Sequence, residues 1–230
     1  MPRVVVFDVN ETLLDLRVLD EPFKRHLGDA SLRPVWFRQV IQIAITATII
    51  GAPYRHFGEV GTAALRMVAD RAGVVLTDEA RDEITGRMLS LPPHPDVPAG
   101  LRRLRVAGFR TAALTNSPLA AARVQLEAVN LIELFDNVMS VESVGAFKPD
   151  ARVYRMAAQK LGVETAGILM VAAHDWDLAG AMAAGCAGAF VERPGQVLNP
   201  YFDPPDIVGR DIPEVADLII AAETRAPRLT

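Results

Sequence analysis

Val4-Val5-Val6-Phe7-Asp8 opens the chain with an apolar run that ends in a carboxylate, and the polar loop Val9-Asn10-Glu11-Thr12-Leu13 follows it directly. β-Branched residues in the run favour a buried strand, so Asp8 is expected at a strand's carboxyl end. Similar aliphatic runs recur between helical patterns farther along the chain. This alternation predicts an α/β fold with a doubly wound parallel sheet covered on both faces. The expected strands are residues 3–7, 110–114, 138–141, 168–171 and 187–191.

The strand pattern is interrupted between residues 16 and 90. Three helical candidates occupy this stretch, at residues 34–50, 58–72 and 77–89. The proline-rich segment 91–98 cannot continue a helix and is expected to return the chain to the sheet. We therefore expect residues 16–90 to form an α-helical cap, and residues 1–15 and 91–230 to form the core.

Composition narrows the classes of protein. Half of the 230 residues are hydrophobic, which is enough for a substantial core, and the single Cys186 excludes an internal disulfide framework. The net charge is −4 and the basic residues are scattered, so no nucleic-acid partner is expected. The start of the chain lacks a signal-peptide pattern, and the longest apolar stretch, residues 40–50, is too short to span a bilayer. We expect a cytoplasmic protein without a membrane partner.

Polar clusters follow four of the expected strands. The carboxyl ends of parallel strands meet at one edge of an open sheet, where ligands bind. Taken alone, Asp8 also fits a turn aspartate that caps a helix. Ser117 and Pro118 fit the N-cap and first position of a helix, and Gly185 fits the end of a helix over residues 177–184. The clusters are residues 8–15, Thr115-Asn116-Ser117, Lys148-Pro149-Asp150 and His174-Asp175-Trp176-Asp177.

The order and spacing of these clusters resemble the haloacid dehalogenase superfamily over essentially the whole chain. The resemblance implies a Rossmann-like core with an inserted cap, in which Asp8 is a covalent nucleophile. It also implies catalytic roles for Thr12, Lys148 and Asp177.

Two departures from the superfamily pattern bear on the reaction. Phosphatases of the superfamily carry a second acid two residues after the nucleophile, where this chain has Asn10, and an amide cannot act as a general acid. Magnesium-dependent members carry a carboxylate four residues before the final aspartate, where this chain has Ala173. Both departures are similar to the metal-independent L-2-haloacid dehalogenases, so no cofactor or metal is expected.

Further stretches resemble that family's substrate site. Trp36-Phe37-Arg38-Gln39 is similar to a cap motif whose arginine holds the halide and the substrate carboxylate, although Arg38 also fits a snorkelling surface residue. Tyr154 follows Lys148 by six residues, as an active-site tyrosine does in that family, although without the resemblance it would count as ordinary helix packing. Trp176 is similar to a tryptophan of the pocket wall, although it also fits a core residue. Thr115 with Asn116 also fits a helix cap. The expected substrate and halide residues are Asn10, Arg38, Gln39, Phe57, Thr115, Asn116, Tyr154, His174 and Trp176.

The resemblance implies that Asp8 displaces halide from a short 2-haloalkanoic acid, and that water, with Asp177 as its base or as the residue that orients it, hydrolyses the resulting ester to a 2-hydroxy acid. Many relatives have a serine, serine, asparagine run where this chain has Ala172-Ala173-His174. We expect His174 to bind water or substrate in its place, with backbone contacts as the alternative reading. Glu11, where relatives have glycine, indicates a reshaped pocket.

Two rival functions stay open at this point. One is a magnesium-dependent phosphatase or phosphonate-cleaving member of the superfamily, and the other is a catalytically silent binding protein of the same fold. Relatives of this type are commonly homodimers, so we expect a homodimer, to which the apolar residues 40–50 could contribute.

Overall fold

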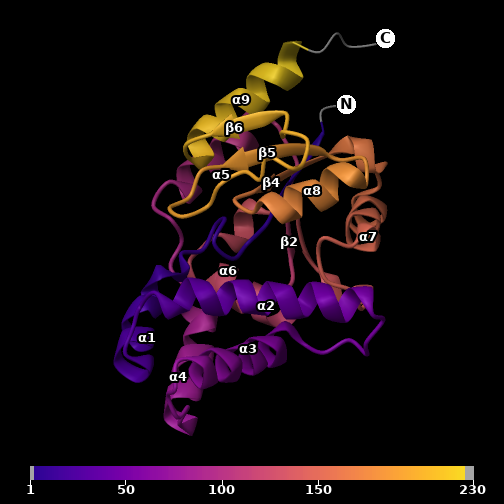
Figure 1. Ribbon diagram of the computed structural model, residues 1–230. Coiled ribbons are helices and arrows are strands. Elements are labelled where there is room, and N and C mark those ends of the chain that lie inside the picture. Colours follow the sequence, from indigo (N-terminus) through magenta and orange to yellow (C-terminus); the bar gives the residue numbers. More distant parts are fainter. Residues whose placement is uncertain (1–2, 226–230) are drawn as a thin grey trace.

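A computed structural model describes residues 3–225. Six parallel strands form one sheet in the order β3-β2-β1-β4-β5-β6 (Figure 1). All four residues of β1 are at most 2% exposed, because β1 lies between β2 and β4 in the middle of the sheet. The strands are β1 (Val4–Phe7), β2 (Thr111–Thr115), β3 (Asn137–Ser140), β4 (Ile168–Ala172), β5 (Ala187–Val191) and β6 (Ile207–Gly209).

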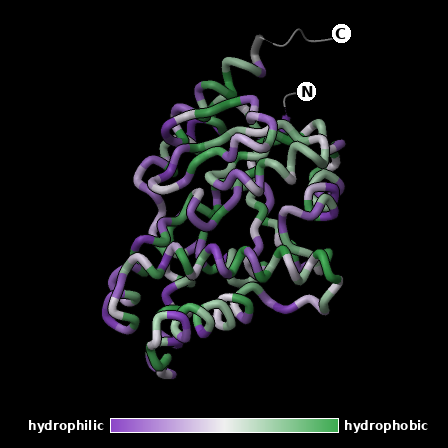
Figure 2. The backbone as a smooth tube through the Cα atoms, in the orientation of Figure 1, coloured by the Kyte–Doolittle hydropathy of each residue, from purple (hydrophilic) through white to green (hydrophobic). Residues whose placement is uncertain are grey.

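Helices cover both faces of this sheet, as the sequence predicts. α5 packs against α9 on one side, and α7 packs against α8 on the other (Figure 1). The hydrophobic segments gather along the strands (Figure 2). The core helices are α5 (Val97–Val106), α6 (Leu119–Ala128), η3 (Ile132–Leu134), η4 (Val141–Ser143), α7 (Ala151–Leu161), η5 (Thr165–Gly167), α8 (Asp175–Ala183) and α9 (Ile212–Arg225).

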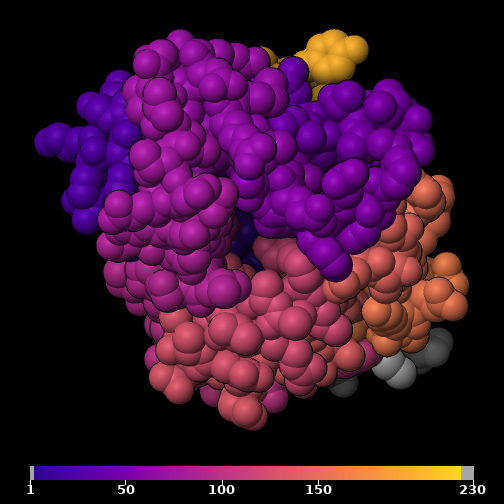
Figure 3. Space-filling view, turned by 90° about the horizontal axis from the view of Figure 1, so that it is seen from below, coloured from indigo at the N-terminus to yellow at the C-terminus, as the bar shows by residue number. Residues whose placement is uncertain are grey.

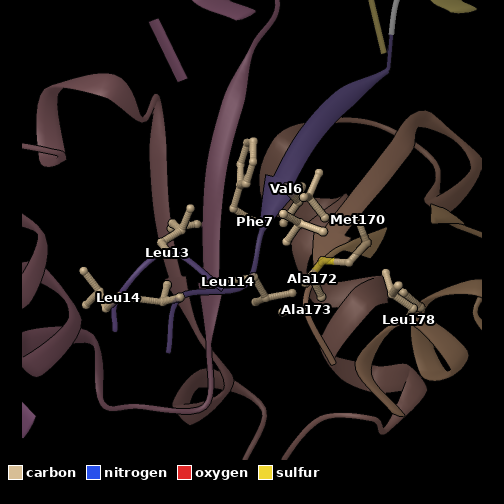
Figure 4. Packing of buried hydrophobic residues seen from close by; sticks show 14 of the residues in the cluster. Val6, Phe7, Leu13, Leu14, Leu114, Met170, Ala172, Ala173 and Leu178 are labelled. Atoms are coloured by element: carbon tan, nitrogen blue, oxygen red, sulfur yellow. The ribbon is translucent and has the colours of Figure 1, made fainter. Parts of the chain in front are cut away.

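The packing beside β1 is visible at close range (Figure 4). Val6 pairs in register with Met170 of β4, and both side chains are fully buried. Continuous apolar strands of this kind are what a parallel sheet with two covered faces requires. The core therefore fixes the position of the residue that follows β1, Asp8.

A helical region lies beyond the carboxyl ends of the strands, with α2 running across them (Figure 1). The segments leaving and returning to the core lie side by side, because the amide of Asp15 donates to the carbonyl of Pro92 at 2.8 Å. We propose residues 16–90 as the cap and the remaining described residues as the core. The cap segments are η1 (Leu16–Leu19), α1 (Asp20–Leu27), α2 (Leu32–Ile49), α3 (Phe57–Arg71), α4 (Asp78–Arg87) and η2 (Met88–Ser90).

The sequence predicted no range for several elements, α1 and β6 among them, and the predicted start of α6 is wrong. α1 and β6 were missed because the first is short and charged and the second has only three residues. The expected N-cap at Ser117 is corrected, since α6 begins at Leu119 with Pro118 as its N-cap. None of the helices within residues 3–225 is long and apolar enough to cross a membrane.

Candidate active site

Asp8 lies where the carboxyl ends of the central strands converge. Its backbone amide donates to the carbonyl of Val171 at 3.0 Å, which ties the residue to the end of β4. The side chain is only 8% exposed, but three donors surround it. Oδ2 accepts from the Thr12 hydroxyl at 2.6 Å and from Nδ1 of His174 at 3.2 Å, while Oδ1 accepts from Nζ of Lys148 at 3.1 Å.

These contacts keep Asp8 ionised. Burial alone raises the pKa of a carboxyl group, but the ammonium of Lys148 and the protonated ring of His174 lower it more. The net effect holds the pKa of Asp8 well below its ordinary range. Thr12 contributes in the same direction, and its own oxygen accepts from the backbone amide of Ala173 at 3.0 Å. A buried anion next to a cleft is suited to attack on an electrophile.

Lys148 links Asp8 to a second buried carboxylate. Its Nζ lies 2.8 Å from Oδ2 of Asp177, and neither side chain is exposed. Burial lowers the pKa of Lys148, but the two carboxylates outweigh burial and raise it. Burial raises the pKa of Asp177, and the charge of Asp8 adds to that increase against the opposing effect of Lys148. Asp177 is therefore a stronger base than an ordinary aspartate.

Tyr154 lies behind this pair. Its hydroxyl donates to Oδ1 of Asp177 at 2.7 Å and is 2.9 Å from the backbone oxygen of the same residue. The tyrosine is 1% exposed, and burial holds its pKa well above the ordinary value. Tyr154 thus orients Asp177, whereas the sequence predicted a substrate contact.

His174 is enclosed by two carboxylates and two aromatic rings. Its Nδ1 lies 3.2 Å from Asp8, and its Nε2 lies 3.0 Å from Oε2 of Glu11. The rings of Phe37 and Trp176 stack on it, with centroids at 5.8 and 5.0 Å. Burial lowers the pKa of His174, but its hydrogen bonds to the two carboxylates raise the pKa to about 10. Both nitrogens are engaged, so the expected binding of water by His174 has no free nitrogen to support it.

Glu11 and Arg33 are further functional candidates. The sequence indicated only that Glu11 reshapes the pocket, and nothing in it pointed to Arg33. Oε1 of Glu11 lies 2.9 Å from Arg33 of α2, and Oε2 also accepts from Gln196 at 2.9 Å. The Nε of Arg33 also donates to Oδ1 of Asp20 at 2.8 Å. Glu11 has a φ of 62°, a left-handed conformation that costs a non-glycine residue about 1 kcal/mol. The only sequence signal was the replacement of the glycine of relatives by Glu11.

The expected placement of Arg38 is corrected by the structure. Arg38 is exposed and belongs to the solvent-facing side of α2, whereas the preceding residue, Phe37, is 5% exposed and faces His174. Consecutive helical residues point about 100° apart, so only one of the two can face the site. Gln39 faces α3 instead, where its Oε1 accepts from Arg71 at 2.6 Å.

Asn116 and Thr115 lie at the end of β2. Oδ1 of Asn116 accepts from the backbone amide of Lys148 at 3.0 Å, and its Nδ2 has no acceptor among residues 3–225. The hydroxyl of Thr115 accepts from the amide of Ser117 at 3.1 Å and so shapes this turn. Asn10 donates to the Ser117 hydroxyl at 3.2 Å, while its own Oδ1 is buried and has no donor among the described residues.

An apolar cavity of about 350 Å³ lies between cap and core. Phe37 connects this cavity with the surroundings of Asp8, because it lines the cavity and its ring also stacks on the imidazole of His174. A hollow between the cap and the core opens to the surface, and indigo atoms of the N-terminal segment lie at its bottom (Figure 3). The cavity is lined mainly by Trp36, Phe37, Val40, Phe57, Met88, Leu89, Ser117, Pro118, Ala121 and Gln125.

The residues do not fit a magnesium site of the superfamily type. Ala173 is buried and offers no side-chain oxygen, and both oxygens of Asp8 already face Lys148, Thr12 or His174. No group of three histidine, cysteine or acidic side chains within the described part of the chain is arranged to hold a metal ion. Magnesium prefers carboxylates and waters, so the donor set is unfavourable.

Comparisons with known proteins place the chain in a family and match its fold. A model of haloacid dehalogenase-like hydrolases matches residues 2–185. The (S)-2-haloacid dehalogenase 1 of Pseudomonas sp. (strain CBS-3) is 31% identical over 185 residues, covering 80% of this chain and 81% of that protein. The structure of the L-2-haloacid dehalogenase RSc1362 has a TM-score of 0.89 at 26% identity and covers 95% of this chain and 98% of its own. Phosphatase MT3486 of Mycobacterium tuberculosis (strain CDC 1551 / Oshkosh) is 38% identical over 125 residues, 53% of this chain and 57% of that protein.

Proposed function

Because this chain belongs to the haloacid dehalogenase-like hydrolases, we propose that it converts short 2-haloalkanoic acids to 2-hydroxy acids and halide through an ester on Asp8. The observation that carries the proposal is the buried, ionised carboxylate of Asp8 with Lys148 3.1 Å away. A desolvated carboxylate next to fixed positive charge can displace a leaving group from carbon.

The hydrogen bonds of Asp8 distinguish its two oxygens. Oδ2 accepts from Thr12 and His174, whereas Oδ1 accepts only from Lys148 among residues 3–225. Oδ1 therefore keeps a lone pair free for attack. Its bond to C2 forms as the carbon–halogen bond breaks, and the halide leaves with the bonding pair. Attack opposite the halogen inverts C2.

The groups assigned to substrate and halide lie around the carboxylate of Asp8 or line the apolar cavity. Nδ2 of Asn116 is a free donor, and Lys148 and His174 supply positive charge. Trp176 and Phe57 are assigned to the pocket wall. Arg38 and Gln39 are not assigned, because they face solvent and α3.

Water completes the reaction by attacking the carboxyl carbon of the Asp8 ester. Asp177 takes the proton from water, which its raised pKa favours. The bond between the carboxyl carbon and the former Oδ1 then breaks, Asp177 returns its proton to that oxygen, and the hydroxy acid leaves with it. The second proton of the water is lost from the carboxyl group of Asp8 to solvent, which restores the carboxylate. The oxygen from water stays in the Asp8 carboxylate.

The rival reading as a phosphatase has one observation in its favour, the similarity to the mycobacterial phosphatase. Against it, Asn10 cannot protonate a leaving alkoxide, and its side chain is committed to Ser117. The reading as a silent binding protein conflicts with the buried ionic pair of Asp8 and Lys148, which is costly to maintain without a use.

Halide release from 2-chloro and 2-fluoro acids in the presence of a chelator tests the proposal. We expect turnover that the chelator does not diminish and that Asp8→Asn abolishes. Phosphate release from phosphomonoesters that requires magnesium, with no halide release from any acid, would favour the phosphatase. Neither activity, together with ligand binding that Asp8→Asn leaves unaltered, would favour the silent protein.

We also propose a cytoplasmic homodimer without a nucleic-acid partner. The scattered basic residues argue against a nucleic-acid partner, and the single, buried Cys186 fits a reducing compartment. The homodimer rests on the resemblance to the L-2-haloacid dehalogenases. Light scattering on the protein as it elutes from a size-exclusion column is expected to give twice the mass of the chain. A mass equal to that of one chain would contradict the homodimer.

A further inference from the structure

Seven charged side chains alternate in sign between the core helix α8 and the cap helix α1. Each lies within 3.2 Å of the next, and His174 is the central member. Alternation lets each buried charge face opposite charges, which offsets the cost of removing it from water. The order is Asp177, Lys148, Asp8, His174, Glu11, Arg33 and Asp20.

We propose that the His174 imidazolium and the Thr12 hydroxyl stabilise the oxyanion that forms on Oδ2 of Asp8, and that Glu11 is the positioning residue that holds His174 protonated and in place. This inference rests on the proposed ester route. His174 acts on the reacting atoms, whereas Glu11 acts through His174.

The geometry of Oδ2 supports the first part. After Oδ1 becomes the ester oxygen, Oδ2 is the ester carbonyl oxygen, and it already faces Thr12 at 2.6 Å and His174 at 3.2 Å. When water adds to the carboxyl carbon, the carbonyl electron pair moves to Oδ2 and creates the negative charge. Two preorganised donors, one of them cationic, face that charge. When the ester bond breaks, the pair returns to the carbonyl.

The environment of Glu11 supports the second part. Its backbone adopts a left-handed φ of 62°, which disfavours any residue with a side chain, yet its carboxylate reaches His174, Arg33 and Gln196 within 3.0 Å. The backbone carbonyl of Glu11 is fixed by His94 at 3.0 Å. Strain is tolerated where surrounding contacts over-determine a conformation, and such positions cluster at functional sites.

Every element packed against His174 favours a protonated ring. The strand-end residue Asp8 and the loop residue Glu11 present carboxylates to its two nitrogens. Phe37 from α2 and Trp176 from α8 present ring faces, which attract cations. The cations Lys148 and Arg33 lie one step farther, behind Asp8 and Glu11, and Asp177 lies behind Lys148.

The loss of either carboxylate would therefore lower the pH at which His174 loses its proton. In the wild type the pKa of about 10 keeps the ring cationic through neutral pH. Glu11→Gly removes one carboxylate and also relieves the left-handed strain, so this variant is expected to fold. Glu11→Gln keeps a hydrogen-bonding side chain without the charge.

The test compares two readouts of the wild type, Glu11→Gly and Glu11→Gln. NMR titration of the His174 ring reports protonation, and the alkaline limb of the kcat profile for halide release reports turnover. We expect both to shift together to lower pH in Glu11→Gly, with kcat at pH 9 reduced at least about tenfold and a smaller loss at pH 6. Glu127→Gln, which removes an exposed carboxylate of α6, is the control and should leave both readouts in place.

A His174 ring that is neutral at pH 7 in the wild type, or that titrates unchanged in Glu11→Gly, would overturn the proposal. So would a kcat profile that does not follow the titration. If no variant, including the wild type, releases halide while the NMR shift occurs as expected, the assignment of Glu11 to His174 is supported and the proposed dehalogenation is contradicted.

Discussion

The ammonium of Lys148 lies 3.1 Å from the carboxylate of Asp8. It also contacts Asp177 at 2.8 Å, so its removal leaves two buried carboxylates without their shared cation. We expect Lys148→Met to lower kcat at least about a thousandfold and to destabilise the fold by about 3 kcal/mol. Halide release and urea unfolding measure the two effects, and activity within tenfold of the wild type would contradict the role.

Arg33 and Arg38 form a matched pair on α2, because the first faces Glu11 and the second faces solvent. Arg33→Ala removes the ion pair between cap and core and is expected to lower kcat/KM about tenfold, whereas Arg38→Ala should stay within about twofold. Steady-state kinetics with one 2-haloacid give the kcat/KM of both variants for comparison with the wild type. The reverse result would restore the role that the sequence predicted for Arg38.

The raised pKa of His174 also predicts how stability depends on pH. The pKa is about 10 in the fold against an ordinary value of 6.5, so the protonated ring stabilises the fold fully below pH 6.5. That contribution is lost as the pH rises from 6.5 toward 10. The difference in unfolding free energy between the wild type and His174→Gln should therefore shrink across this window. A difference that is constant from pH 6 to pH 10 would show that the ring is not protonated in the fold.

The apolar cavity predicts which substrates the enzyme accepts. Ala121 lines the cavity, whereas Val124 on the same helix is 49% exposed. Ala121→Phe should raise KM about tenfold for an acid with a longer alkyl chain and leave haloacetate within about twofold, because only the longer chain needs the space. Val124→Phe is the control. An equal effect of Ala121→Phe on both acids would place substrate elsewhere.

Most of the fold was predictable because local patterns report it. Apolar runs report buried parallel strands, and the predicted strands differ from β1 to β5 by one residue at most at either end. β6 was missed because three residues, with Val208 44% exposed, carry no distinct period. α1 was missed because Pro22 and its charged neighbours resemble a loop.

The site was predictable only where residue order reports it. Asp8, Lys148 and Asp177 each follow a strand-end pattern, and the structure brings their side chains together. The orientation of α2 was not predictable, because an error of one residue turns a helix face by about 100° and exchanges Arg38 for Phe37. The contacts of Glu11 join it to residues 22, 163 and 185 positions away, which no local pattern contains.

Isotope transfer to Asp8 tests the central claim most directly. A single turnover of a 2-haloacid with excess enzyme is run in ¹⁸O water, and the peptide that contains Asp8 is analysed by mass spectrometry. The ester route places the oxygen of water in the Asp8 carboxylate and leaves the first hydroxy acid unlabelled. Label found only in the hydroxy acid would mean that water attacks C2 directly, and Asp8 would not be the nucleophile.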